Sequence, residues 1–343
     1  MLRRDFLTRS TLAPLAAAAA AAAPVKPGVD LFSLRTQNWT PFQHLDYCAK
    51  FGAKVVHFSE IRFLGGLEDE HVRKVGEHAA SLGIELEIGM RSICPSSSLF
   101  DAKAGTAEEQ LTRVIRAATI AKSKLVRAFL GHMGDRRGAI PIAGHIENVV
   151  KVLKACRSRA MDAGIKIAIE NHAGDMQARE LKGLIEAAGT DFVGACFDSG
   201  NPVWAIEDPH LTLETLAPYI LTSHIRDSYL WSTPEGAAVR WVRMGEGNIG
   251  IEKLLTRFQE LCPGKAMSLE IIVTGPRTFA WRQPEFWQAY QHTPAWEFAR
   301  FAAIAAAGTP QAPQPPVPKE AAAQREREDF EASAAWTKSF LKL

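Results

Sequence analysis

IKIAIENHAGDMQARELKGLIEAAGTDFVGACFD, residues 165–198, decides the fold. This stretch begins with a short apolar run rich in β-branched residues, continues through a segment of helical periodicity, and ends with a second apolar run. A strand, a helix and a strand in this order are typical of parallel strands joined by crossover helices. Each of the two runs ends on a carboxylate, Glu170 in the first and Asp198 in the second.

The same alternation runs through most of the 343-residue chain. Eight short apolar runs predict strands, and longer segments of helical periodicity separate them. The predicted strands are VDLFSL (29–34), KVVHFS (54–59), IELEIG (84–89), LVRAFL (125–130), IKIAIE (165–170), FVGACFD (192–198), ILTSHI (220–225) and AMSLEII (266–272). Two of the helical segments, 68–83 and 144–164, end on glycines, which commonly terminate helices.

Two α/β architectures share this alternation. A doubly wound open sheet is one, but no G-x-G-x-x-G sequence opens the first helix as it does in the dinucleotide-binding form of that fold. Eight evenly spaced units favour a closed barrel, and their total length is usual for a (β/α)8 barrel. We therefore predict one catalytic (β/α)8 TIM barrel over residues 28–306.

Both ends of the chain predict segments outside that barrel. In residues 1–24, Arg3 and Arg4 precede an apolar run that is too short to anchor in a bilayer, which resembles a cleaved twin-arginine export signal. The sequence thus predicts an exported, periplasmic protein without a stable membrane anchor. At the other end, we expect the last barrel helix within 285–308, interrupted near Pro294. A Pro-rich linker (308–319) and a helical tail (320–343) follow.

Charge and cysteine content exclude several classes of protein. Removing residues 1–23 takes away three arginines and one aspartate, so 37 basic and 37 acidic residues remain of the original 40 and 38. A neutral domain lacks the net positive charge that binds a phosphate backbone, so no nucleic-acid partner is expected. The five cysteines have no paired spacing, which argues against a zinc knuckle and a disulfide framework.

Four potential metal ligands stand at the ends of consecutive predicted strands. Glu170, Asp198, His224 and Glu270 are spaced by about one strand–helix unit each, and active sites of this fold lie at the carboxyl ends of the strands. Three carboxylates brought together would repel one another unless a cation neutralised them. The sequence therefore predicts one divalent metal ion. The oxygen-rich ligand set favours Mn²⁺, Mg²⁺, Co²⁺ or Fe²⁺ over Zn²⁺.

Five short sequence motifs resemble those of a known family. They are IAIENH (167–172), CFDSGNP (196–202), HIRD (224–227), MGEGNI (244–249) and SLEI (268–271). Their order and spacing resemble the xylose isomerase-like barrel superfamily, which contains sugar isomerases and epimerases as well as endonuclease IV-type repair enzymes. The resemblance implies the same four metal ligands. It also implies that Glu170 and Glu270 are catalytic and exchange protons with a sugar through a metal-stabilised enediolate, as in an isomerase or epimerase.

Further residues are expected to bind a small-molecule carbohydrate. His172 has the parity to face the barrel mouth, and Asn201, Arg226 and Asp227 follow strands that carry ligands. Two weaker candidates, Glu60 and His132, close the second and fourth predicted strands. The sequence leaves open whether the protein is a homo-oligomer.

The sequence departs from the family pattern at two positions. The four metal ligands match the pattern, but the particular reaction does not follow from it. Asn201 stands where the repair endonucleases and many ketose 3-epimerases have a histidine, and Met176 stands where those epimerases have a glutamate. Three alternatives therefore remain beside the isomerase or epimerase. One is a lyase or dehydratase of keto-sugars or 3-keto-glycosides, the second is a non-catalytic carbohydrate-binding protein, and the third is an AP endonuclease.

Overall fold

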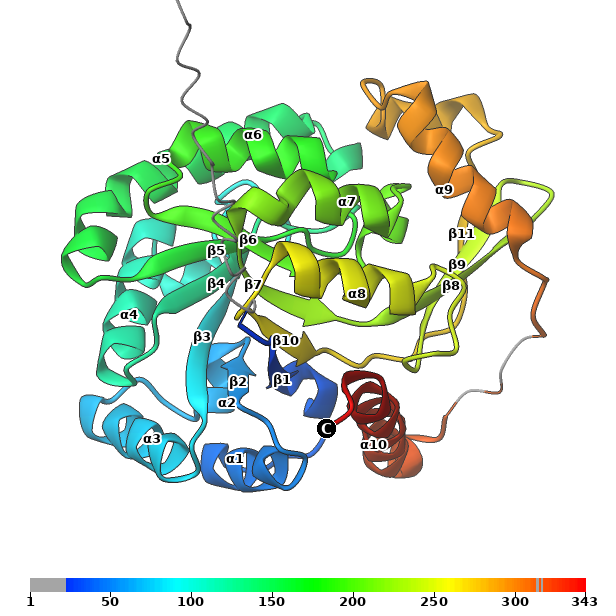
Figure 1. Cartoon of the computed structure of the whole chain (residues 1–343). Helices are drawn as coiled ribbons and strands as arrows, with labels where there is room; N and C mark the ends of the chain where they lie inside the picture. The colour runs from blue at the N-terminus through cyan, green and yellow to red at the C-terminus, as the bar shows by residue number, and fades with distance from the viewer. Residues whose placement is uncertain (1–22, 313–314, 316) are drawn as a thin grey trace, which may run out of the picture.

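The computed structural model describes residues 23–312, 315 and 317–343 of the chain (Figure 1). Nearly all of the predicted export signal, residues 1–22 of 1–24, and three residues of the predicted linker lie outside the described residues. Within the described residues, no helix is both long and apolar enough to cross a bilayer.

Eight parallel strands close into a barrel, as predicted. They are β1 (Lys26–Asp30), β2 (Val55–Phe58), β3 (Glu85–Ser92), β4 (Leu125–Phe129), β5 (Lys166–Glu170), β6 (Val193–Asp198), β7 (Ile220–Ile225) and β10 (Ala266–Leu269). Their order around the barrel is β1-β10-β7-β6-β5-β4-β3-β2, and β1 pairs with β10 to complete the ring. All eight strands predicted from the sequence are present, with ends shifted by a few residues.

Helices surround the barrel on its outside (Figure 1). Around it lie α1 (Pro41–Lys50), α2 (Ile61–Leu64), α3 (Asp69–Ser81), α4 (Ala107–Ile120), α5 (Ile142–Asp162), α6 (Ala178–Ala188), α7 (Pro209–Leu216), α8 (Ile251–Leu261) and α10 (Ala322–Leu341), whereas α9 (Ala295–Ala307) packs elsewhere. Local sequence sets several of their starts. Thr40 and Thr106 each form a capping box, in which the threonine hydroxyl accepts a backbone N–H of the first turn.

The first strand differs from its prediction. It was expected over 29–34, but β1 ends at Asp30 and Leu31–Leu34 form a 3-10 helix. The physical reason is Asp30 itself, whose carboxylate accepts the backbone N–H of Phe32 at 2.8 Å and caps that helix. Apolar alternation continues across this point, so the pattern alone did not reveal the end of the strand.

The segment between β7 and α8 was expected to be a long loop but contains sheet structure. Strands β8 (Asp227–Ser232) and β9 (Ala237–Val242) form an antiparallel hairpin, and β11 (Arg277–Phe279) pairs with β9 from the segment after β10. Helix α9 packs against β8 and β9. This small sheet stands beside the barrel (Figure 1).

The last barrel helix is not where it was expected. The segment 285–308 contains α9, which packs on the small sheet instead of on the barrel. Helix α10 lies against the barrel near β1 and β10 (Figure 1). Its Phe330 is fully buried and packs on Phe51 at the end of α1, with 5.2 Å between ring centroids. Residues of β1, β10 and α10 also line one small cavity between them. The tail is therefore the helix that covers the seam of the barrel.

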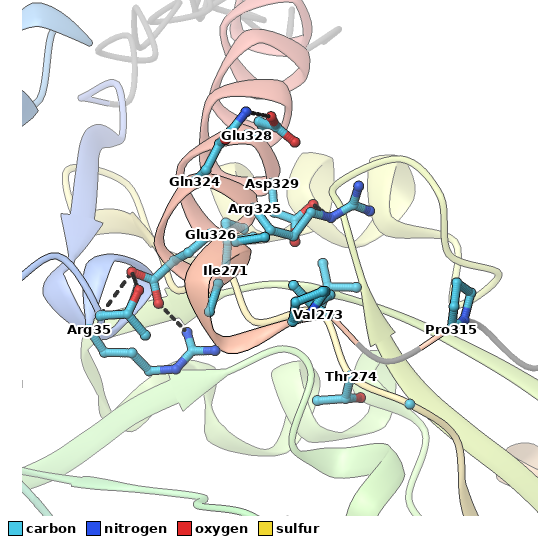
Figure 2. A pocket seen from close by; sticks show the side chains of 16 residues that line it. Arg35, Ile271, Val273, Thr274, Pro315, Gln324, Arg325, Glu326, Glu328 and Asp329 are labelled. Carbon is cyan, nitrogen blue, oxygen red and sulfur yellow. Dashed lines mark hydrogen bonds and ion pairs between the residues drawn. The ribbon is translucent and has the colours of Figure 1, made fainter.

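Helix α10 also holds loops that follow the strands. Glu326 accepts hydrogen bonds from the backbone N–H and the hydroxyl of Thr36, both at 2.9 Å, and pairs with Arg35 at 3.3 Å (Figure 2). Asp329 accepts from Nε of Arg243 at 2.7 Å. A cavity of about 780 Å³ lies between this helix and the segment after β10. The contacts tie α10 to the end of the barrel where the strands finish.

Candidate metal centre and active site

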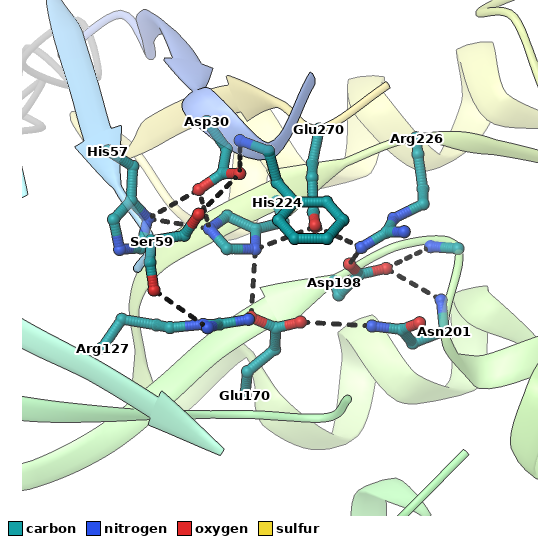
Figure 3. Close-up of polar contacts among 12 residues, drawn as sticks. Asp30, His57, Ser59, Arg127, Glu170, Asp198, Asn201, His224, Arg226 and Glu270 are labelled. Atoms are coloured by element: carbon teal, nitrogen blue, oxygen red, sulfur yellow. Dashed lines mark hydrogen bonds and ion pairs between the residues drawn. The ribbon is translucent and has the colours of Figure 1, made fainter. Parts of the chain in front are cut away.

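Four side chains from four strand ends meet at the carboxyl end of the barrel (Figure 3). Glu170 is the last residue of β5, Asp198 is the last of β6, His224 lies one residue before the end of β7, and Glu270 directly follows β10. One ligand atom of each residue lies within 4.8 Å of the other three, and all four residues are buried. The structure therefore brings together the four residues that the sequence predicted as metal ligands.

Glu170 is held on both of its carboxylate oxygens. Nε of Arg127 on β4 donates to Oε2 at 2.5 Å, and the Asn201 side chain donates to Oε1 at 3.2 Å. The remaining donors of Arg127 are engaged too, because Nη1 reaches the carbonyl oxygens of Ser59 at 3.4 Å and Met90 at 3.3 Å. Glu170 is fully buried, so it has little freedom to move.

Glu270 has a more open setting. One nitrogen of Arg226, Nη2, donates to both Glu270 and Asp198, whereas Nε and Nη1 of the same guanidinium have no hydrogen-bond partner among the described residues. The guanidinium lies over the ring of Trp241, 4.3 Å from its centroid. Gly200 makes room for this arrangement, since a Cβ there would overlap the Arg226 side chain.

A cavity of about 210 Å³ opens beside these groups. Of the predicted substrate-binding residues, His172, Asn201, Arg226 and Glu60 line it, together with Glu270. The His172 ring stacks on Phe129 with centroids 3.8 Å apart, and its Nδ1 lies 2.6 Å from the carbonyl oxygen of Gly131. Of the four predicted metal ligands, Glu270 is the one that lines this cavity.

Two predicted substrate-binding residues do not line the cavity. The Asp227 carboxylate accepts the backbone N–H groups of Gly245 at 3.0 Å and Gly247 at 2.9 Å, so it shapes the loop after β9. His132 lies beyond the end of β4, where its Nε2 is 2.9 Å from the hydroxyl of Ser98. Both side chains have protein partners that explain their positions.

Below the four ligands lies a buried layer that the sequence reasoning missed. Asp30 on β1, His57 on β2 and Glu87 on β3 stand side by side in the register of the barrel. Nδ1 of His57 lies 2.7 Å from Nε2 of His224, and Oδ2 of Asp30 lies 3.3 Å from the same His224 nitrogen. Burial holds the pKa of His57 well below its usual range, so its ring is neutral.

The missed residues left a signal in the sequence. Arg127 is a charge inside an apolar strand, LVRAF, and Asp30, His57 and Glu87 occupy polar positions within β-rich runs. A polar side chain at an inward position of a barrel strand is costly unless it is paired. The predicted site residues all stand at or beyond the ends of strands, whereas these four lie at or below that level.

The three carboxyls of the centre differ in the direction in which their pKa values shift. Burial alone would raise the pKa of Glu170, but Arg127 and His224 hold it well below its usual range. Burial would also raise the pKa of Glu270, but Arg226 and His224 lower it to about 2. For Asp198, burial prevails over Arg226 and raises the pKa to about 7.

The donor set fits a divalent cation. Nδ1 of His224 is buried and has no hydrogen-bond partner among the described residues, although it lies 3.0 Å from Oε2 of Glu170 and 3.1 Å from Oε2 of Glu270. A nitrogen aimed between two carboxylates without a hydrogen bond is arranged as a metal ligand is. Three carboxylates and one imidazole form a ligand set suited to hard and borderline divalent ions.

Comparison with known proteins places this chain in a family. The family model described as "Xylose isomerase-like TIM barrel" matches residues 44–289. The uncharacterized protein YihM of Escherichia coli (strain K12) is 26% identical over 236 residues, which cover 68% of this chain and 66% of that protein. The 3-oxo-isoapionate decarboxylase of Pectobacterium atrosepticum is 23% identical over 192 residues, which cover 56% of this chain and 62% of that enzyme. The chain thus spans less than two thirds of the length of either relative.

Solved structures share the fold at low identity. D-psicose 3-epimerase of Clostridium cellulolyticum H10, solved with D-tagatose, superposes with a TM-score of 0.57 at 14% identity, covering 82% of this chain and 96% of that one. The probable 3-DHS dehydratase AsbF of Bacillus anthracis gives 0.55 at 13% identity, with 79% and 100% covered. The IolI protein with a bound zinc atom gives 0.55 at 17% identity, with 82% and 96% covered.

Proposed function

The chain belongs to the xylose isomerase-like TIM barrel family, and from this premise we propose that it is a divalent-metal-dependent isomerase or epimerase of carbohydrates. The observation that carries the proposal is the convergence of Glu170, Asp198, His224 and Glu270 within 4.8 Å. They meet beside a cavity of about 210 Å³ that Glu270 lines. That volume suits a small molecule of the size of a monosaccharide.

The proposed reaction begins with removal of a proton next to a carbonyl. A divalent cation held by the four ligands would polarise the carbonyl oxygen and acidify the neighbouring C–H. Glu270, which faces the cavity, would accept the proton. Nε and Nη1 of Arg226, which have no hydrogen-bond partner among the described residues, would donate to the oxygen on which negative charge develops, while Asn201 and His172 would hold substrate hydroxyls. In an epimerase, Glu170 would return a proton from the opposite side.

The metal itself is part of the proposal. Three oxygen ligands and one nitrogen favour Mn²⁺, Mg²⁺, Co²⁺ or Fe²⁺, and Zn²⁺ is the alternative. Elemental analysis of the purified protein, followed by removal of metal with a chelator and reconstitution with each ion, identifies the ion that restores activity.

Deuterium exchange tests the proposed chemistry. The protein is incubated in D₂O with a panel of keto-sugars and sugar acids, and we expect deuterium to enter the carbon next to the carbonyl of the accepted substrate. Exchange should stop when the metal is removed. Turnover of a substrate without any exchange at such a carbon would overturn the proposal.

One observation favours a second candidate, a lyase or dehydratase acting on a keto-sugar or a 3-keto-glycoside. Glu170 has both oxygens engaged, by Arg127 and Asn201, and it is absent from the lining of the cavity. With Glu270 as the only glutamate of the pair that faces substrate, loss of a leaving group after proton removal needs no second base on the opposite side. The 3-oxo-isoapionate decarboxylase is a relative whose name denotes a bond-breaking reaction.

Product analysis decides between the two candidates. An isomerase or epimerase gives a product of the same mass as its substrate. A lyase or dehydratase gives two products, or one product lighter by water. Mass spectrometry of the mixture after complete conversion distinguishes them without a labelled substrate.

Export to the periplasm remains a separate proposal, which rests on Arg3 and Arg4 ahead of the apolar run. Residues 1–24 fused to a reporter protein should direct it across the membrane in cells with a functional twin-arginine pathway. Replacement of both arginines by lysine should prevent this. Equal export of both fusions would contradict the proposal.

A further inference from the structure

The strongest buried feature that the proposed reaction does not use is the contact between two histidines. His57 and His224 lie on β2 and β7, both side chains are fully buried, and Nδ1 of the first is 2.7 Å from Nε2 of the second (Figure 3). The rings are tilted by 53° with centroids 4.7 Å apart. The contact is a hydrogen bond between ring nitrogens and not a stack of the two rings.

This hydrogen bond determines which nitrogen of His224 is available to a metal. The two nitrogens of the ring face different groups, because Nδ1 points between Glu170 and Glu270 while Nε2 points at His57. When Nδ1 offers its lone pair to a cation, the ring proton resides on Nε2 and requires an acceptor. Nδ1 of His57, 2.7 Å away, is placed to be that acceptor.

Asp30 supports the same arrangement. Its Oδ1 accepts the hydroxyl of Ser59 at 3.0 Å and the backbone N–H of Phe32 at 2.8 Å, which fixes the carboxylate. The other oxygen, Oδ2, then lies 3.3 Å from Nε2 of His224 and 3.7 Å from Nδ1 of His57. This oxygen is a second acceptor beside Nε2–H, which favours the ring proton on Nε2 and leaves Nδ1 free to act as a ligand.

We propose that His57 is a positioning residue of the metal centre, which accepts Nε2–H of His224 and thereby fixes Nδ1 toward the cation. This inference rests on the metal site of the proposed function. It assigns a function to a buried histidine on β2 that lies outside the four ligands and outside the cavity lining.

A second cation between Asp30, His57 and His224 is the competing explanation, since their ligand atoms also lie within 4.8 Å of one another. The 2.7 Å between the two ring nitrogens argues against it. Two nitrogens bound to one ion at about 2.0–2.1 Å in tetrahedral geometry are farther apart than this, whereas 2.7 Å suits a hydrogen bond.

The test measures metal affinity rather than turnover. Metal-free wild-type protein and the variants His57→Leu and His57→Asn are titrated with Mn²⁺ and with Co²⁺ against a chromophoric chelator. We expect His57→Leu to weaken binding by about 10- to 100-fold, as loss of a partner of a metal-bound histidine does. His57→Asn should stay within a few-fold of wild type, because its side-chain oxygen can replace Nδ1 as the acceptor.

A matched control separates positioning from packing. His44 on α1 is another buried histidine, and His44→Leu should leave the affinity for Mn²⁺ and Co²⁺ unchanged. The visible spectrum of the Co²⁺ protein gives a second measurement, since it should shift in His57→Leu and not in His44→Leu. Thermal unfolding of each metal-free variant verifies that it is folded.

The possible results distinguish this inference from the proposed function. If wild type binds neither Mn²⁺ nor Co²⁺, both the proposed metal site and the role of His57 are overturned. If wild type binds and His57→Leu binds equally well, only the inference is overturned. It is also overturned if His57→Asn loses as much affinity as His57→Leu, because the effect would then come from packing.

Discussion

Glu170 and Glu270 flank the same histidine, yet their surroundings differ. Glu170 is enclosed by Arg127 and Asn201 and has no contact with the cavity, whereas Glu270 shares one nitrogen of Arg226 and lines the cavity. Their oxygens lie at nearly equal distances from Nδ1 of His224, 3.0 Å and 3.1 Å. Two glutamates proposed as ligands of one centre thus differ in their surroundings: the first is held by fixed partners, and the second lines the cavity.

Replacing each glutamate by glutamine tests this difference with the largest expected effect. Glu270→Gln removes the proton acceptor and should lower the rate of solvent deuterium exchange by about 100- to 10,000-fold. Glu170→Gln, measured at a metal concentration that saturates both variants, should retain exchange into the substrate. Equal loss in both variants would show that the two glutamates act as a pair, as an epimerase requires.

Removing Arg127 tests whether Glu170 depends on its fixed counter-charge. Arg127→Met leaves a buried carboxylate without its partner and should cost about 3–5 kcal/mol of unfolding free energy in the metal-free protein. Added Mn²⁺ should restore part of this loss, because a cation would take over as counter-charge. Denaturant unfolding with and without Mn²⁺ measures both effects.

Arg136 provides the matched control for Arg127. The buried Arg136 pairs at 2.7 Å with Glu180, which is partly buried and lies outside the four ligands. Arg136→Met should also destabilise the protein, but Mn²⁺ should not restore its stability. Restoration to the same extent in both variants would mean that the metal stabilises the fold generally and not through Glu170.

The pH dependence of metal binding tests the third carboxylate. Burial raises the pKa of Asp198 to about 7 in the metal-free protein, so the carboxyl is protonated below that pH and ionised above it. A cation must displace this proton, and apparent affinity should therefore fall by up to about tenfold per pH unit below pH 7 and level off above it. The same raised pKa predicts that the contribution of Asp198 to folding stability declines as pH rises through 7. A metal affinity that stays constant from pH 5.5 to 8.5 would contradict the predicted role of Asp198 in metal binding.

The smallest effect is expected at Asn201. Asn201→Ala removes one hydrogen bond to Oε1 of Glu170, worth about 1 kcal/mol, or a few-fold in metal affinity. Because Asn201 also lines the cavity, the KM for substrate should rise together with the metal dissociation constant. A change in KM alone would mean that the residue serves the substrate and does little to hold Glu170.

Much of the fold could be predicted because strand and helix periodicities alternate with few interruptions. The predicted elements were wrong where one sequence pattern is compatible with two kinds of secondary structure. Leu31–Leu34 continue the apolar run of β1 but turn into a 3-10 helix under the cap of Asp30. The hairpin of β8 and β9 was expected to be a loop, although the turn residues of 233–236, TPEG, separate two β-rich runs.

The site could be predicted only as far as strand ends reveal it. Position in the strand was enough to predict that the four proposed ligands lie together, because the fold directs carboxyl ends to one place. It was not enough for Arg127 or His57, whose partners lie on other strands, 43 and 167 residues away along the chain. Such pairings depend on the register between strands, which periodicity does not specify.

The position of α10 has a consequence for the order in which the chain folds. Strands β1 and β10 pair across some 240 residues, Lys26 with Ala266, and the helix that covers their seam is made later still. Long-range closure of this kind is slow, and nascent chains expose apolar surface until it is complete. During synthesis, Phe51 and Met267 would face water until α10 arrives. We therefore expect the seam to be among the last apolar surfaces of the barrel to be covered during folding.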